Sequence, residues 1–313
     1  MTLRLTSYRN DEGDIRVGAL VGEKMLDVAD AVAAAGAAPQ AHDCCRSVAE
    51  LLACPDCLDA VRNALDGAPD STVVEGAELL APIPCPPKLF CLATNFASHM
   101  AESVSQKLQG GKPQRDLDTP RVFMKPSVNT VIGPDVPLRL DAGSQFVDYE
   151  AELAIIIGKP AKEVPVEEAA AHVSGVTALN DISERSLKIW EREEERDWDK
   201  FFDWLNGKWC DGFAPMGPCA VPISDAGDPD DLQIILRLNG DVKQNASTAE
   251  MIFNVAEIVS YISFICTLQT GDVIACGTPA GVGQHQGINL KDGDVLEVEI
   301  PPIGVLRTPV VGP

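Results

Sequence analysis

The chain has 313 residues, of which 45% are hydrophobic, so it is long enough to form one large globular domain and a smaller one. Its 47 acidic residues outnumber its 25 basic residues and give a formal net charge of −22. This charge argues against nucleic acid or an anionic membrane surface as a partner. The first residues contain no apolar signal-peptide region, and polar residues interrupt the longest apolar helical stretch, 251–268. We therefore expect a cytoplasmic protein that does not span a membrane.

Residues 1–75 are expected to form a small α+β domain. Three short apolar segments, at 3–8, 16–21 and 24–28, predict a three-stranded meander, and two or three helices follow. No combination of residues in this domain suggests a catalytic site.

Ten cysteines are spread along the chain, and in a cytoplasmic protein we expect reduced thiols that pack as small apolar side chains. Cys44, Cys45, Cys54 and Cys57 lie close together in sequence and include a Cys-x-x-Cys pair, so a structural zinc site is an alternative. The adjacent pair has poor spacing for a zinc knuckle, and the surrounding residues predict two helices. Packing is therefore the favoured interpretation.

A second domain, predicted over residues 76–313, begins with prolines at 82, 84, 86 and 87. Asn239-Gly240 predicts a β-hairpin, and residues 295–300 alternate like a strand. The capping box Ser247-Thr-Ala-Glu250 predicts a helix over 249–268 that ends at Gly271, before another strand at 273–277. Many hairpins and few helices predict an α+β, β-rich fold with a closed or rolled sheet.

His99 and Glu102 are the first residues of this domain that suggest chemistry. In a helix they lie on one face, where the carboxylate would make the imidazole a stronger general base. An ordinary surface pair is the alternative. The polar stretch 103–119 is either a solvated loop or part of a lid over about 97–118.

Glu150 and Glu152 lie in a predicted strand at 148–158, and residues two apart on a strand point to the same face. The apolar run suggests a strand buried on both faces, where adjacent carboxylates need a compensating charge. Asp181 ends the next predicted buried strand, 173–181, and would supply a third carboxylate. Three carboxylates favour Mg²⁺, Mn²⁺ or Ca²⁺ over zinc. The alternative to a metal site is that Glu150 and Glu152 are solvated glutamates at the end of a strand.

Lys208 is flanked by apolar and turn residues. A partly buried lysine there would neutralise negative charge that develops on an enolate, and a snorkelling surface lysine is the alternative. The Gly-rich segment 277–283 lacks the lysine of a phosphate-binding loop, so we expect it to allow close approach of the backbone to a ligand.

In order and in chemistry these segments resemble the fumarylacetoacetate hydrolase family. The resemblance covers roughly residues 85–310, and it is specific because many separate pieces agree. The matching segments are Asn95–Glu102, Phe123–Ser127, Asp148–Leu153, Asn180–Arg185, Gly207–Lys208, Met251–Phe253, Gly271–Ile274 and Gly277–Gly283.

The resemblance implies a β-roll of mixed sheets behind a small N-terminal domain, usually as a homodimer. It implies Mg²⁺ or Mn²⁺ held by Glu150, Glu152 and Asp181, and a small-molecule oxo-acid that chelates the metal through two oxygens. It further implies that His99 and Glu102 act as a catalytic dyad on a lid and that Lys208 lies near the reacting carbonyl. Arg185, Lys125 and Thr278 match positions that contact the substrate or line the site.

The expected activity is hydrolysis of a carbon–carbon bond in an acylpyruvate-type substrate, a 2,4-dioxo acid of aromatic or sugar-acid catabolism. Decarboxylation, hydration, tautomerisation or isomerisation of a chelated 2-oxo acid would use nearly the same residues and remains an alternative. A calcium-stabilised binding protein without catalytic activity is a more distant one. Lys188, where relatives often have Gln, and the long charged segment 190–205 depart from the family pattern and bear on substrate choice.

Overall fold

The computed structural model describes residues 2–36, 44–100, 102, 119–141 and 143–313. The predicted lid over about 97–118 therefore lies largely outside the described residues. In the part of the chain that is described, no helix is both long and apolar enough to cross a membrane.

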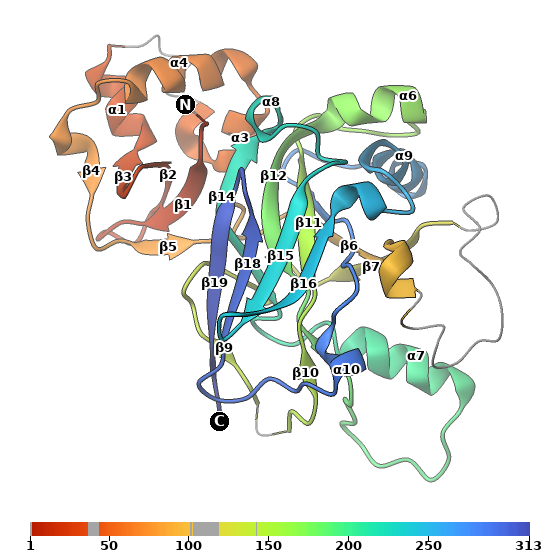
Figure 1. The fold of residues 1–313 in the computed structure, drawn as a ribbon. Helices are drawn as coiled ribbons and strands as arrows, with labels where there is room; N and C mark the ends of the chain where they lie inside the picture. The colour runs from red at the N-terminus through yellow and green to blue at the C-terminus, as the bar shows by residue number, and fades with distance from the viewer. Residues whose placement is uncertain (1, 37–43, 101, 103–118, 142) are drawn as a thin grey trace.

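The N-terminal part contains the predicted meander and the predicted helices (Figure 1). Leu5 lies opposite Ala220, so the first strand continues into the large sheet of the rest of the chain. The division into domains near residue 75 stays a prediction. The elements are β1 Leu5–Arg9, β2 Ile15–Val21, β3 Lys24–Asp27, α1 Val28–Ala34, η1 Cys44–Arg46, α3 Val48–Leu52, α4 Pro55–Leu65, η2 Asp70–Thr72, β4 Val73–Val74 and β5 Glu78–Leu80.

The large mixed sheet has the strand order β4-β3-β2-β1-β14-β12-β11-β17-β6-β7, with β5 beside β1 and β8 beside β14. A second sheet has the order β16-β15-β18-β19-β9, and β10 pairs with β13. These strands are β6 Leu89–Ala93, β7 Arg121–Lys125, β8 Val131–Ile132, β9 Leu138–Arg139, β10 Val147–Asp148, β11 Ala151–Ile157, β12 Val173–Asn180, β13 Ser183–Glu184, β14 Ala214–Pro222, β15 Gln233–Leu238, β16 Asp241–Ser247, β17 Val273–Ala275, β18 Val295–Ile300 and β19 Gly304–Val311.

The helices lie around these sheets, with α6 beside α9 and α7 on another side of the molecule in the view of Figure 1. They are α6 Val166–Ala169, η4 Ala170–His172, α7 Asp197–Asn206, α8 Ile223–Ala226, η5 Thr248–Glu250, α9 Val255–Ile265 and α10 Gly283–Gln286. The predicted β-rich α+β fold is confirmed.

Strand β11 is buried on both faces, as predicted. Leu153, Ile155 and Ile157 pack into one hydrophobic core, whereas Ala154 and Ile156 pack into a second core shared with the N-terminal helices. Alternation along the strand places Glu152 on the same face as Ala154 and Ile156. Packing of β11 into both hydrophobic cores therefore fixes the end of the strand that contains Glu152.

The helix predicted over 249–268 is wrong at both ends. Residues Thr248–Glu250 form only a 3₁₀ turn, and α9 begins after Asn254, whose side chain forms a capping box with Glu257. Asn95 holds the intervening backbone extended, because its side chain accepts from Phe253 N at 2.9 Å and donates to Phe253 O at 3.0 Å. The helix ends at Ile265, well before Gly271.

The expectation of reduced thiols also fails for one pair of cysteines. Cys44 and Cys57 form a disulfide, because η1 and the first turn of α4 bring their Cα atoms to 6.5 Å. The neighbouring Cys54 keeps a free thiol.

Candidate active site

Three predicted carboxylates meet where β11 begins and β12 ends. Glu152 is in β11, Glu150 directly precedes it, and Asp181 directly follows β12. The antiparallel pairing places Ala151 opposite Asn180, and Asp181 N donates to Glu150 O at 2.8 Å. The side chains of Glu150, Glu152 and Asp181 are almost fully buried, and one oxygen from each lies within 4.8 Å of the others.

Three cationic side chains surround this cluster. Lys208 Nζ lies 2.6 Å from both Glu150 Oε2 and Asp181 Oδ2, and Lys125 Nζ lies 2.5 Å from Asp181 Oδ1. Arg185 forms ion pairs with Glu150 and with Asp148. The two lysines are as buried as the carboxylates, so the arrangement is a buried ionic network.

The pKa values show how the charges are balanced. Burial alone would raise the pKa of Glu150, but Arg185 and Lys208 outweigh burial and hold it below its usual range. Burial, followed by Asp181 and Glu150, raises the pKa of Glu152 well above its usual value. Glu152 is therefore the member of the cluster with the least compensating positive charge.

The residues fit a hard divalent cation. Their donors are carboxylate oxygens, and the Glu152 side chain, which has the least compensating charge, favours additional positive charge beside it. The adjacent Gly277 N–H donates to Glu152 Oε2 at 2.7 Å, which fixes the orientation of that carboxylate. Glu150, Glu152 and Asp181 would hold the ion.

His99 and Glu102 lie on one helical turn, as predicted, because residues 97–100 and 102 are helical. His99 Nδ1 is 3.8 Å from Glu102 Oε2, and Gly281 N–H donates to Glu102 at 3.1 Å. Burial is the largest cause that lowers the pKa of His99, and Arg185 and His285 lower it further against the opposing effect of Glu150. A neutral imidazole that can accept a proton is the result.

A cavity of about 140 Å³ is lined by His99 of the dyad and by Glu150 of the carboxylate cluster. Thr278 lines it, and its hydroxyl accepts from Gln244 Nε2 at 2.8 Å. Phe123 and Trp204 form an aromatic wall with ring centroids 5.1 Å apart. The lining residues are Leu92, Ala93, Thr94, His99, Phe123, Glu150, Arg185, Trp204, Lys208 and Thr278.

Volume alone does not identify this site. A larger hollow of about 410 Å³ lies beside β2, α3 and the proline segment, but none of the clustered ionic residues lines it. The small cavity is the better candidate because the neutral imidazole of His99, the Glu150 carboxylate and the buried cations Arg185 and Lys208 line it together.

Sequence reasoning missed several residues of the site. Asp148 accepts from Arg185 and from Gly283 N–H, and His285 places its ring centroid 5.8 Å from that of His99. Phe123 and Trp204 come from β7 and α7, which are distant in sequence. Neither the strand pattern nor the run of charged residues in the sequence indicates that these side chains lie close together.

Comparison with known proteins shows the family to which the chain belongs. The family model described as fumarylacetoacetate (FAA) hydrolase, C-terminal, matches residues 88–311. The chain belongs to the fumarylacetoacetate hydrolase family. Members of this family typically bind divalent metals, in agreement with the acidic cluster.

Relatives in this family differ in the reaction that their names describe. The oxaloacetate tautomerase fahd2 of Xenopus laevis is 36% identical over 256 residues, which cover 81% of this chain and 75% of the relative. The structure of a fumarylacetoacetate hydrolase from Exiguobacterium antarcticum has a TM-score of 0.77 at 31% identity and covers both chains completely. A probable 2-hydroxyhepta-2,4-diene-1,7-dioate isomerase from Mycobacterium abscessus has a TM-score of 0.74 at 26% identity, covering 100% of this chain and 99% of its own. Family membership therefore supports an enzyme, and the choice between hydrolase, isomerase and tautomerase depends on other evidence.

Proposed function

We propose that this chain is a divalent-metal-dependent enzyme that cleaves a carbon–carbon bond in an acylpyruvate-type 2,4-dioxo acid. The carrying observation is that a buried neutral His99 and the Glu150 carboxylate, together with Lys208, line one small cavity. This combination suits the activation of water beside a substrate that develops negative charge.

The metal would be held by Glu150, Glu152 and Asp181. When bound, Mg²⁺ or Mn²⁺ would polarise the oxygens of the oxo-acid as a Lewis acid. Arg185 lines the cavity and would bind the substrate carboxylate, while Lys125 stabilises Asp181 from the other side. Thr278 would contact the ligand through its hydroxyl.

The proposed reaction begins with proton transfer to His99. Because Nδ1 faces Glu102, the opposite ring nitrogen, Nε2, is the one that accepts the proton from water. The water oxygen bonds to the distal carbonyl carbon, and the bond from that carbon to the pyruvate methylene breaks. The bond's electron pair becomes the enolate of pyruvate, whose negative charge Lys208 stabilises. Cleavage releases a carboxylic acid, and the proton held by His99 is returned to the methylene carbon of the enolate, which yields pyruvate.

A second candidate is keto–enol tautomerisation of a short 2-oxo diacid. The relative from Xenopus laevis that bears the name oxaloacetate tautomerase favours it, as does a cavity of about 140 Å³, which suits a small substrate. This reaction needs a proton to move between carbon and oxygen at the substrate, and no water is consumed. His99 and Lys208 would serve it in the same positions.

A panel of substrates separates the two candidates. Acylpyruvates, fumarylpyruvate and oxaloacetate would be supplied with Mg²⁺ or Mn²⁺, and products would be identified by mass. Pyruvate with a carboxylic acid supports cleavage, whereas unchanged mass with rapid enol–keto interconversion, followed by ultraviolet absorbance, supports tautomerisation. If no oxo-acid is converted with either metal, the enzymatic proposal fails and a calcium-stabilised binding protein becomes the better interpretation.

We also propose that the protein is a homodimer. The helix α7 exposes three aromatic side chains, Trp198, Phe201 and Phe202, each more than half exposed, and such a surface favours association. Light scattering of the purified chain would give a mass near twice 33.4 kDa. A monomeric mass at micromolar concentration would contradict the proposal.

A further inference from the structure

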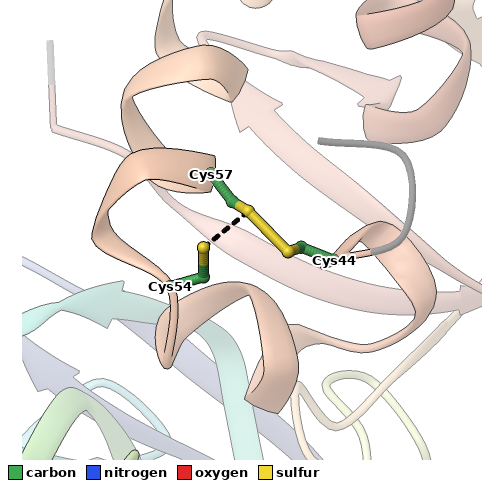
Figure 2. Close-up of side chains that lie close together, drawn as sticks. All are labelled: Cys44, Cys54 and Cys57. Atoms are coloured by element: carbon green, nitrogen blue, oxygen red, sulfur yellow. Dashed lines mark hydrogen bonds between the residues drawn. A yellow bond between two sulfur atoms is a disulfide. The ribbon is translucent and has the colours of Figure 1, made fainter. Parts of the chain in front are cut away.

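Three sulfur atoms converge at the beginning of α4, in the N-terminal part of the chain (Figure 2). Cys44 and Cys57 form the disulfide, and the Sγ atom of Cys54 lies 2.6 Å from Cys57 Sγ. None of these cysteines lines the catalytic cavity.

The local structure explains why two of the sulfurs meet. Cys54 is the N-cap of α4, Pro55 occupies the first helical position, and Cys57 lies one turn into the helix. A polar N-cap side chain ordinarily accepts a hydrogen bond from the first turn, but Cys54 makes no such bond. Its sulfur contacts the sulfur of Cys57 instead.

The three cysteines differ in their access to solvent. Cys57 is buried, with 4% of its surface exposed, whereas Cys44 and Cys54 are only partly buried. Cys57 is thus a central sulfur with a more accessible sulfur on each side. Either outer residue is placed to be its disulfide partner.

From this arrangement we propose that Cys44, Cys54 and Cys57 form a thiol–disulfide exchange site that reacts with low-molecular-weight disulfides of the glutathione type. In the internal step, Cys54 loses its proton to solvent and attacks Cys57 Sγ. The Cys54–Cys57 bond forms, the Cys44–Cys57 bond breaks, and the electron pair leaves on Cys44 Sγ, which then takes up a proton. No net oxidation occurs in this step.

Formation of a disulfide in the fully reduced site is the oxidative step. Two protein thiols are oxidised to a disulfide, and the low-molecular-weight disulfide is reduced to two thiols by way of a mixed disulfide on an outer cysteine. The reverse reaction returns the site to three thiols. The thiol of a third cysteine beside the disulfide distinguishes this site from a structural crosslink.

The sequence allows a direct test by tryptic digestion. Cleavage after Lys24, Arg46 and Arg62 places Cys44 on the peptide 25–46, and both Cys54 and Cys57 on the peptide 47–62. The Cys44–Cys57 disulfide therefore joins two peptides, whereas the Cys54–Cys57 disulfide closes a loop within one. The whole protein would be equilibrated with mixtures of oxidised and reduced glutathione, quenched in acid, alkylated, digested and examined by mass spectrometry with fragmentation to assign the bonded sulfurs.

The wild-type protein is expected to give both the joined peptides and the loop. The amounts of both should rise together as the proportion of oxidised glutathione increases. Cys54→Ser should retain only the joined peptides and Cys44→Ser only the loop, whereas Cys85→Ser, which removes an exposed cysteine elsewhere, should match the wild type. The proposal is overturned if the wild type gives only joined peptides while Cys54 is alkylated at every glutathione ratio. It is also overturned if the reduced protein retains one equivalent of zinc that Cys54→Ser loses, because the sulfurs would then be metal ligands.

Discussion

At the scale of single residues, His99 and Glu102 are expected to act as one unit. Substituting His99→Ala should lower kcat by about 10²–10⁴-fold, because a positioned general base typically contributes that much. Glu102→Gln should have a smaller effect, since it leaves the imidazole in place. The double variant should be little worse than His99→Ala, because residues that act together are not additive.

The control for this prediction is metal affinity, which none of the three variants should change. Steady-state kinetics at saturating metal would provide the comparison. If the two losses multiplied, His99 and Glu102 would be independent contacts. If His99→Ala left kcat unchanged, the proposed proton transfer to this residue would be wrong.

The pH profile gives a second test at this scale. Burial lowers the pKa of His99 below its ordinary 6.5, so the neutral base persists below that pH and kcat/KM should fall only under more acidic conditions. His285 lowers the pKa of His99 and Glu102 raises it. His285→Ala should therefore shift the acidic limb to higher pH, and Glu102→Gln should shift it to lower pH. Shifts of both variants in the same direction would show that another group controls the limb.

The sequence was a good guide to residues whose relation is local. Glu150 and Glu152 share a face because they are two apart, and His99 and Glu102 share a helical turn because they are three apart. Asp148 and His285 could not be predicted, since their partners Arg185 and His99 are 37 and 186 residues away and no spacing rule applies. The catalytic roles of all these residues remain proposals.

At the scale of elements, the Gly-rich loop after β17 connects the parts of the site. Gly277 N–H donates to Glu152, Gly281 N–H donates to Glu102, and Gly283 N–H donates to Asp148. The backbone of this loop therefore contacts three carboxylates of the protein itself, whereas its expected close approach to a ligand stays a prediction.

Gly281→Ala is expected to disrupt this loop. At Gly281 φ is +103°, and a Cβ atom would lie 2.1 Å from Lys243 O, so the loop would have to move. We expect a loss of about 1–3 kcal/mol in stability together with a large fall in kcat, because Glu102 loses its fixed position. Thermal unfolding and kinetics of the purified variant would measure both effects.

Gly287→Ala is the matched control. Gly287 also has a positive φ, of +69°, but a Cβ atom there would meet no other atom of the described residues within 4 Å. It should cost about 1 kcal/mol in stability and leave the kcat of the folded enzyme unchanged. Equal losses of kcat in the two variants would mean that general loosening, and not the contact with Glu102, affects turnover.

The elements themselves were predicted with uneven success. The hairpin at Asn239-Gly240 is confirmed between β15 and β16, since both residues adopt the positive φ that this turn requires. The helix after residue 249 was misplaced, because Asn95 binds Phe253 from 158 residues away and overrides the local capping signal. Tertiary hydrogen bonds of this kind have no local signature.

At the scale of the whole molecule, the order of strands was beyond the reach of the sequence. Alternation shows which face of a strand is buried, but it does not identify the neighbouring strand. Leu5 pairs with Ala220, and the parallel pairing of β17 with β6 joins residues more than 180 apart. The β-rich class followed from the many hairpins and few helices, and the family resemblance implied mixed sheets, but neither gave the order of the strands.

Removal of the metal is expected to affect the entire fold. Glu150, Glu152 and Asp181 are anchored in strands that contribute to both hydrophobic cores, so an ion bound to them stabilises the native state selectively. Mg²⁺ at about 100 times its Kd would add about 2.7 kcal/mol to the free energy of unfolding. Scanning calorimetry should show a Tm several degrees higher with Mg²⁺ than with a chelator, and activity should be lost and regained in parallel. Glu150→Gln should abolish the Mg²⁺-dependent rise, whereas Glu250→Gln, at an exposed position, should preserve it. A chelated enzyme verified to be free of metal that kept full turnover would exclude the proposed metal-dependent chemistry.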